Sequence, residues 1–251
     1  MVLFPVAQPW RQALLLGALV VWAVFLFGGF LFGRRNAEGT RRMPTWTRMA
    51  SSCALVVAAW LWFIFTRETS VGGYALLIAL GMTLGFLGDL FLAPLLPVAQ
   101  PTLAGIAAFG LGHIAYLVAL VSFANAHDLN APGPRWAALA VWLLIGAAGW
   151  YFVVSRGQKA TVLHWAALPY ALLLASLAGV ATGLALQSAL FLPLAVGAAL
   201  FLLSDLILAG ELFAGLFFPL IGDVIWLTYG PAQALIVYSV ASALRVAGVM
   251  I

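Results

Sequence analysis

The chain has 251 residues, of which 65% are hydrophobic and only 7% are charged, and its mean hydropathy is +1.14. Soluble globular domains carry about 25% charged residues, so this composition excludes a soluble domain and indicates an integral membrane protein. The formal net charge of +4 does not indicate nucleic-acid binding, because no basic patch is interleaved with aromatic residues.

Apolar runs long enough to cross a bilayer follow one another along the whole chain. A hydrocarbon core about 30 Å thick needs about 20 residues of helix, and charges, Pro or Gly residues separate the runs. The sequence therefore predicts an all-α polytopic membrane protein, with residues 1–251 forming a single bundle of about eight transmembrane helices. The expected helices are residues 12–33, 49–66, 74–93, 101–123, 136–154, 162–183, 188–209 and 221–245. The first is expected to be retained, because its flank "MVLFPVAQPW" lacks the basic region of a signal peptide.

Basic residues in the loops favour one orientation of this bundle. The loop after the first run carries several arginines, and the loop after the fifth run adds Arg156 and Lys159 on the same side of the membrane. The positive-inside rule predicts that this side is cytoplasmic and that both termini lie outside a bacterial plasma membrane. The arginines of the first loop are Arg34, Arg35, Arg41, Arg42 and Arg48.

Two carboxylates interrupt the third and seventh runs. The pattern Asp-Leu-x-Leu-Ala occurs at Asp89, in "GFLGDLFLA", and again at Asp205, in "LLSDLILA". Each Asp lies about 6 Å from the end of its helix, and the two helices run parallel, so both acids approach one membrane face at similar depth. The shared pattern is consistent with a four-plus-four internal repeat. An intramembrane acid usually faces a polar cavity, although either Asp could instead fix helix packing through hydrogen bonds.

A third acid, Asp223 in "LIGDVIW", belongs on the same face at the start of the eighth helix. We expect interfacial water to solvate it.

Polar residues on the fourth and eighth runs share helix faces. His113 and Tyr116 are spaced i, i+3 in "AAFGLGHIAYLVAL", and Tyr229 and Gln233 are spaced i, i+4 in "YGPAQALIVY". The short turn between the third and fourth runs makes those helices antiparallel neighbours. We therefore expect these groups to converge with the two aspartates, and the imidazole of His113 to line the same cavity as both carboxyl groups. The alternative is that His113 only makes a hydrogen bond across a packed interface.

No metal or other cofactor is predicted. The one cysteine, Cys53, excludes an intrachain disulfide and a cysteine-based metal site. The three histidines are too scattered for metal ligation, since His127 lies in a loop and His164 opens the sixth helix.

Four sequence blocks resemble the signature of the lysoplasmalogenase (YhhN-like) membrane proteins. They are "LGDLFL", "GIAAFGLGHIAYLVAL", "GAALFLLSDLILA" and "YGPAQALIV", in fitting order and spacing between the first loop and Gln233. The resemblance implies an eight-helix enzyme that hydrolyses the vinyl ether bond of lysoplasmalogens, releasing a fatty aldehyde and a glycerophospho-alcohol. One departure is that members of that family often carry Lys-Pro early in the second helix, where this chain has Ser52 and Cys53. If that lysine contacts the lipid phosphate, the departure bears on headgroup preference.

Vinyl ether hydrolysis suits two buried carboxylates. The reaction needs an acid that protonates the β-carbon and an anion that stabilises the oxocarbenium ion, and two carboxyl groups sharing one proton supply both. Asp89 and Asp205 are expected to take these catalytic roles, with His113 as an orienting group or proton relay. The lysophospholipid is expected to enter from the bilayer, because its vinyl ether lies just below the headgroup at the depth of the two acids. Water and the glycerol hydroxyl would be placed by Tyr116, Ser204, Tyr229 and Gln233.

Two other functions use intramembrane aspartates. A proton-coupled transporter is the main alternative, although no Gly- or Pro-broken helices occupy matching positions in the two halves. An intramembrane aspartyl protease is less consistent with the sequence, because Phe86 stands where its Gly-x-Gly-Asp motif requires glycine.

Overall fold

Long apolar helices account for most of the residues that the computed structural model describes, which are 4–156 and 161–251. Within these ranges the all-α prediction is confirmed, since there is no strand and eight helical spans are long and apolar enough to cross a membrane. Lys159 lies outside the described residues. The helices are α1 (Pro9–Phe32), α2 (Thr45–Thr66), α3 (Gly72–Leu92), α4 (Pro101–Ala126), α5 (Pro132–Gly149), η1 (Trp150–Ser155), α6 (Val162–Gln187), η2 (Ala189–Phe191), α7 (Leu192–Ala214), α8 (Ile221–Val237) and α9 (Ser239–Val246).

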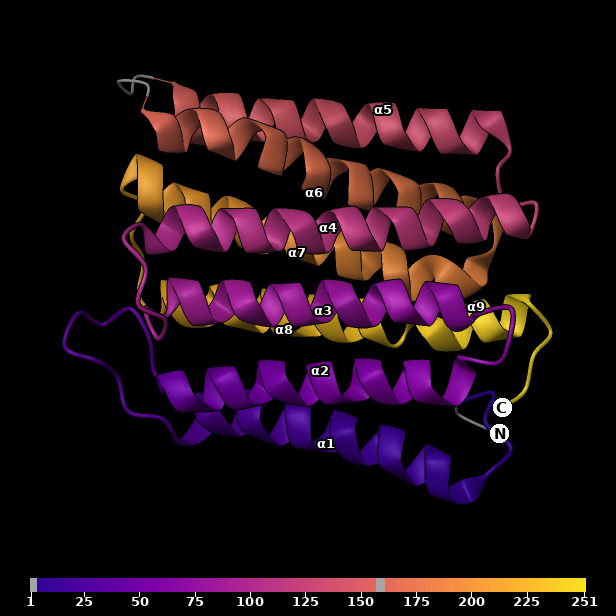
Figure 1. The fold of residues 1–251 in the computed structure, drawn as a ribbon. Helices are drawn as coiled ribbons and strands as arrows, with labels where there is room; N and C mark the ends of the chain where they lie inside the picture. The colour runs from indigo at the N-terminus through magenta and orange to yellow at the C-terminus, as the bar shows by residue number, and fades with distance from the viewer. Residues whose placement is uncertain (1–3, 157–160) are drawn as a thin grey trace.

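The helices alternate in direction across the bundle, and the two termini lie together at one end (Figure 1). The opposite end carries the long loop between α1 and α2, residues 33–44, and we call it the first-loop face. Both α3 and α7 end at this face, as the sequence predicts. However, α7 continues to Ala214, so Asp205 lies nine residues before its end and the predicted spacing of about 6 Å is wrong for this acid. Consecutive membrane-spanning helices pack on one another except α4 and α5, since α4 packs on α6 instead, and α8 also packs on α2 and α3. The four-plus-four repeat stays a prediction.

Several helix boundaries differ from the predicted ones. α2 begins at Thr45 rather than at residue 49, because polar Thr45 and Arg48 belong to its first turns at the membrane surface. The predicted eighth helix is interrupted at Tyr238, whose hydroxyl donates a hydrogen bond of 2.5 Å to the carbonyl of Leu15, and α9 follows it. Prolines open α1, α4, α5 and α7, where the absent N–H group costs no hydrogen bond.

Glycines allow α3 and α4 to approach closely. A Cβ atom at Gly88 would lie 2.5 Å from the ring of Phe109, and one at Gly112 would lie 3.0 Å from the carbonyl oxygen of Gly81. Small residues at a helix interface are a usual means of close packing in membranes, where backbones can then come together. The approach fixes the last turn of α3, which carries Asp89.

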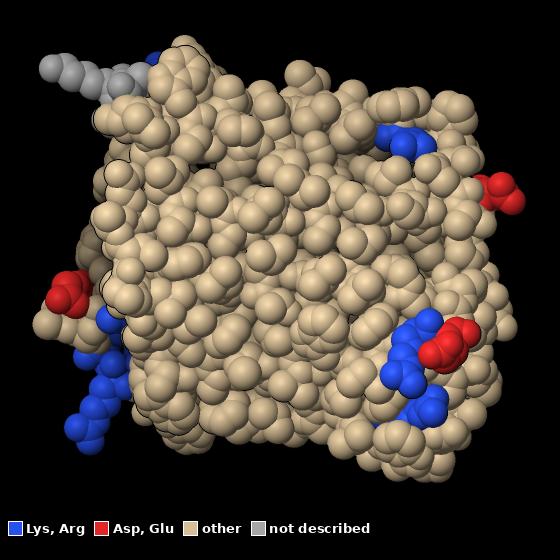
Figure 2. All heavy atoms as spheres, in the orientation of Figure 1, with Lys and Arg blue, Asp and Glu red and all other residues tan. Residues whose placement is uncertain are grey.

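Charged side chains of the described residues avoid the middle of the bundle on the side shown in Figure 2, where arginine, aspartate and glutamate lie at the two ends. The band between them is apolar, as a surface in contact with lipid must be. Three acids are not part of the exposed surface. Asp89 and Asp223 are buried, and Asp205 is half-buried within α7.

Candidate active site

A cavity of about 410 Å³ opens at the first-loop face, between the ends of α2, α3, α4, α6, α7 and α8. Asp89 and Asp205 both line it, together with Ser204 and Tyr229. The structure therefore brings four of the sequence-predicted residues to one cavity. Much of the remaining wall is apolar, and includes Leu92, Ile106, Phe109, Leu174, Leu202 and Trp226.

Asp89 is 4% exposed and is held by two hydroxyl groups. Ser52 on α2 donates to Oδ2 at 2.5 Å, and Tyr229 on α8 donates to the same oxygen at 3.0 Å. Oδ1 has no hydrogen-bond donor among the described residues. This carboxyl group is thus fixed through one oxygen and has the other available to a molecule in the cavity.

A chain of hydrogen bonds continues from Tyr229 into the bundle. Its hydroxyl accepts a bond of 3.2 Å from Nε2 of Gln233, whose Oε1 accepts one of 2.8 Å from the hydroxyl of Tyr116. All three side chains are buried, and the chain joins α4, α8 and α3. Tyr116 and Gln233 do not line the cavity, so they support Asp89 through Tyr229.

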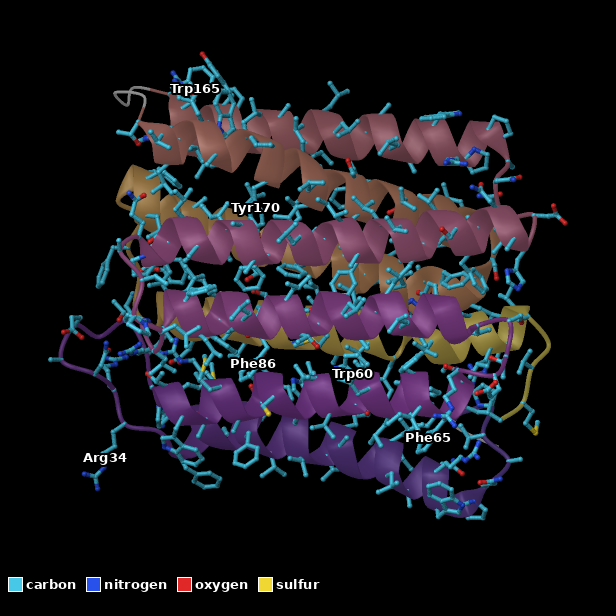
Figure 3. All side chains as sticks on the ribbon, in the orientation of Figure 1. Arg34, Trp60, Phe65, Phe86, Trp165 and Tyr170 are labelled. Atoms are coloured by element: carbon cyan, nitrogen blue, oxygen red, sulfur yellow. The ribbon has the colours of Figure 1, made fainter. Side chains whose placement is uncertain are left out.

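Asp205 has a different partner. The hydroxyl of Tyr170, on α6, donates a hydrogen bond to its Oδ2, and Oδ1 has no donor in the described part of the chain. Tyr170 projects from α6 into the interior of the bundle (Figure 3) and lines the same cavity. Sequence reasoning missed this tyrosine. A polar side chain beside Pro169, inside an otherwise apolar run, was the available signal.

His113 is 1% exposed and does not line the cavity, so the expectation that its imidazole does is wrong. The ring lies among aromatic rings, with centroids 4.6 Å from Phe201 and 5.6 Å from Tyr170. Phe109, one turn nearer the first-loop face on α4, occupies the cavity wall instead. Neither ring nitrogen of His113 has a hydrogen-bond partner among the described residues, so the alternative of a hydrogen bond across the interface is not found either.

Ser204 lies on the cavity wall, but its hydroxyl donates a hydrogen bond of 3.1 Å to the backbone carbonyl of Ile225. This bond joins α7 to α8 immediately before Asp205. The arrangement favours a role in helix packing, and the lone pairs of the hydroxyl can still accept a hydrogen bond from a molecule in the cavity.

Asp223 is buried rather than solvated, which corrects the expectation for this residue. It is 1% exposed, and its oxygens accept hydrogen bonds of 2.5 and 3.0 Å from the backbone amides of Arg42 and Met43. Backbone bonds from Leu220 to Gly39 and from Gly222 to Thr40 lie beside them. Asp223 thus fastens the first loop to the start of α8, because the loop offers amide donors that need an acceptor away from water.

Two basic side chains reach the cavity as well. Arg41, on the fastened loop, and Arg48, in the first turns of α2, both line it. The sequence assigned these arginines only to topology. Glu211 of α7 lines the cavity too, so apart from Asp89 and Asp205 the charged lining among the described residues is two arginines and one glutamate, which we call the cationic rim.

A π-helical segment, η1, borders the cavity where a regular helix was expected up to residue 154. Trp150 and Val154 of this segment line the cavity, and Nε1 of Trp150 donates a hydrogen bond of 3.0 Å to the carbonyl of His164. Short π-helical segments often occur at functional sites, because the wider turn redirects side chains.

Within the described ranges, no group of three His, Cys, Asp or Glu side chains is arranged to hold a metal ion. The prediction that the protein uses no cofactor stays a prediction.

The fold and the site define a multi-pass integral membrane protein whose two intramembrane carboxylates share one cavity near one membrane face. A family model described as the YhhN family matches residues 43–240, so the chain belongs to the YhhN family. This confirms the resemblance drawn from the four sequence blocks and identifies a lysoplasmalogenase-type membrane protein at the level of the family. The match extends from the end of the first loop into α9, and it includes both aspartates. No match was found among curated proteins or among solved structures.

Proposed function

We propose that this protein is a lysoplasmalogenase, a hydrolase that cleaves the vinyl ether bond of a lysoplasmalogen to a fatty aldehyde and a glycerophospho-alcohol. The observation that supports it most is the pair Asp89 and Asp205. The two carboxyl groups line one cavity, and each has an oxygen without a protein donor. The bacterial plasma membrane, with the first-loop face on the cytoplasmic side, stays a prediction from the loop charges.

The reaction requires one proton on the pair. In the first step, the protonated carboxyl transfers its proton to the β-carbon of the vinyl ether, and the oxygen lone pair forms an oxocarbenium ion. The ionised carboxylate stabilises this cation and accepts a proton from water as the water oxygen bonds to the cationic carbon. The product is a hemiacetal, and the pair again carries one proton.

The hemiacetal then collapses. Its hydroxyl proton leaves, the carbonyl of the aldehyde forms, and the bond to the glycerol oxygen breaks as that oxygen takes up a proton. One water is consumed in total, and the carboxyl pair returns to its initial state. Because the two groups act as a coupled pair, we assign the acid and base roles to the pair and not to either residue.

The surrounding residues suit supporting roles. Ser52 and Tyr229 would hold Asp89, and Tyr170 would hold Asp205, so that the free oxygen of each acid faces the reacting carbons. His113 would act as a positioning residue through the ring of Tyr170. The apolar wall would receive the hydrocarbon chain of a lipid entering from the bilayer.

The transporter alternative has less support. A transporter needs access from both membrane faces in turn, whereas the cavity opens at the first-loop face. A second hollow, near Arg135 and Gln187 toward the other face, has a volume of about 10 Å³ and includes none of the polar residues of the cavity.

The test is to incubate purified protein in detergent with a lysoplasmalogen and, separately, with the saturated ether analogue, and to assay aldehyde. We expect aldehyde from the vinyl ether only. Turnover of neither lipid by monodisperse protein would contradict the proposal and favour the transporter.

A further inference from the structure

The cationic rim of the cavity has no role in the chemistry proposed above. We propose that Arg48, assisted by Arg41, binds the phosphate group of the lipid and so sets which part of the lipid reaches Asp89 and Asp205. The identity of the lipid rests on the proposed function.

Arg48 is an arginine without a protein anion. Its Nη2 donates a hydrogen bond of 3.1 Å to Oγ1 of Thr45, and its Nε is buried without a hydrogen-bond partner. No carboxylate oxygen of the described residues lies within 4.0 Å of its nitrogens, although Asp89 and Asp223 act on it electrostatically over a longer distance. Arginines away from water are normally paired, so a partner from outside the chain fits this site.

A second guanidinium stands close to the first. Arg41 is near enough to Arg48 for the two positive charges to repel one another, and both line the cavity. The backbone of Arg41 is held in place, because its amide donates a hydrogen bond of 3.0 Å to Oδ1 of Asn36 and the neighbouring Arg42 amide is bound by Asp223. Two like charges kept together at a cavity mouth favour an anion between them.

The planar guanidinium of Arg48 has a shape that suits a phosphate. Its guanidinium lies over the ring of Trp226, 5.4 Å from the centroid, and the ring also lines the cavity. Stacking fixes the plane of the guanidinium, whose N–H groups form a fork that matches two oxygens of a phosphate.

The spacing from Arg48 to the carboxylate also fits a lysolipid. Arg48 and Ser52 are one turn apart on the same face of α2, a rise of about 6 Å, and Ser52 is bonded to Asp89. In a lysoplasmalogen, five bonds join the phosphorus to the vinyl ether oxygen, which is on the order of 6 Å for an extended chain. A phosphate at Arg48 would therefore bring the vinyl ether to the depth of Asp89.

The experiment measures binding instead of turnover, with two saturated ether lipids of equal chain length. One is 1-O-alkyl-sn-glycero-3-phosphocholine, and the other is the 1-O-alkyl-sn-glycerol that lacks the phosphate. Calorimetric titration in a non-ionic detergent gives Kd for wild type, Arg48→Gln and Arg34→Gln. Arg34 is the control, since it is an exposed arginine of the first loop, points away from the bundle (Figure 3) and does not line the cavity.

Wild type should bind the phospholipid at least about tenfold more tightly than the alkylglycerol, the loss expected for one hydrogen bond to a charged group. Arg48→Gln should remove most of that preference while leaving Kd for the alkylglycerol unchanged, and Arg34→Gln should keep it. Equal weakening of both lipids by Arg48→Gln, or a retained preference, would overturn the proposal.

Two further measurements test the role of Arg41 and distinguish a lipid phosphate from free phosphate. Because Arg41 is exposed, Arg41→Gln should fold normally and reduce the preference about threefold, the effect of one solvated charge. Inorganic phosphate should compete with the phospholipid. If it binds in an Arg48-dependent way while the two lipids bind equally, the site takes free phosphate and the lipid assignment is overturned.

These outcomes are separable from those of the proposed function. A protein that prefers the phospholipid but releases no aldehyde from a lysoplasmalogen would keep the phosphate site and lose the hydrolase. A protein that releases aldehyde but does not prefer the phospholipid would keep the hydrolase and lose the phosphate site.

Discussion

Asp89 and Asp205 begin the same five-residue pattern on two parallel helices that end at one face, yet their surroundings differ. Asp89 is buried and receives two hydroxyl donors, one of which continues through Gln233 to Tyr116. Asp205 is half-buried and receives one donor, from Tyr170. The same local sequence therefore gives one acid a rigid support from three helices and leaves the other dependent on a single side chain.

This difference shows that neighbouring helices, and not the repeated pattern, decide what each acid can do. Pairs of titratable groups in unlike environments commonly divide acid and base roles between them. Asp223 adds a third case, because it is the most buried of the three and yet serves the backbone of a loop.

The largest effect is expected from removing either acid. Asp89→Asn or Asp205→Asn replaces a carboxyl with an amide that cannot protonate carbon, so each should lower aldehyde release by about 10³-fold or more. The fold should survive, since Asn is nearly isosteric and a buried charge is lost. If the two act as one unit, the double variant should lose little more than either single variant.

Aldehyde release from fractions that elute as monodisperse protein measures this. If either Asn variant retained a near wild-type rate, the Asp that it replaces would have no part in the mechanism, and the two acids would not be equivalent.

The next largest effects compare the tyrosines that donate hydrogen bonds to the two acids. Tyr170→Phe removes the donor on Asp205 and should lower kcat about tenfold to a hundredfold, the range for a hydrogen bond to a charged group. Tyr229→Phe leaves Ser52 on Asp89 and should cost only about fivefold. Steady-state kcat for the two variants tests the ranking, and a larger loss for Tyr229→Phe would reverse the comparison.

A smaller effect is expected at His113. His113→Gln should lower kcat about threefold, because it removes the ring that packs against Tyr170 and so loosens the group that holds Asp205, and an aromatic pair is worth about 0.5–1.5 kcal/mol. His113→Phe keeps an aromatic ring there and should restore most of the rate. If both variants lose activity equally, the imidazole carries protons and is not only a packing group.

The smallest catalytic effect is expected at Asp223. Asp223→Asn can still accept from one of the two loop amides and should raise KM a few-fold with little change in kcat, since the acid touches no part of the cavity chemistry. Faster proteolysis of the first loop should accompany it, because the loop loses an anchor. A fall in kcat comparable with that of Asp89→Asn would show that this acid also belongs to the reaction.

Helix number and the two acids could be predicted from sequence for simple physical reasons. A bilayer demands runs of about 20 apolar residues, and a carboxylate within such a run is conspicuous because it is costly. The spacing of Tyr229 and Gln233 also predicted that they share one face of the helix, since residues at i and i+4 are neighbours on any helix.

Other features depend on contacts that no local pattern carries. The face of His113 was predicted, but its exclusion from the cavity depends on Phe109 and on Phe201 from a distant helix. Arg48 looked like an ordinary charge at a membrane surface, and only the packing of α2 on α8 turns it toward Trp226. Asp223 contacts amides about 180 residues earlier in the chain, so its partner could not be found from the sequence around it.

The hydrogen bonds between Asp223 and the first loop have a consequence for the order in which the site forms during synthesis. Chains emerge from the ribosome N-terminal end first, so the first loop is synthesised long before the acid that fastens it. Asp205, Tyr229 and this anchor all belong to the last two spans. A chain released after α6 would carry Asp89 and the arginines of the first loop, but neither the second carboxylate nor a fixed entrance. The site is therefore complete only when α7 and α8 have both been inserted.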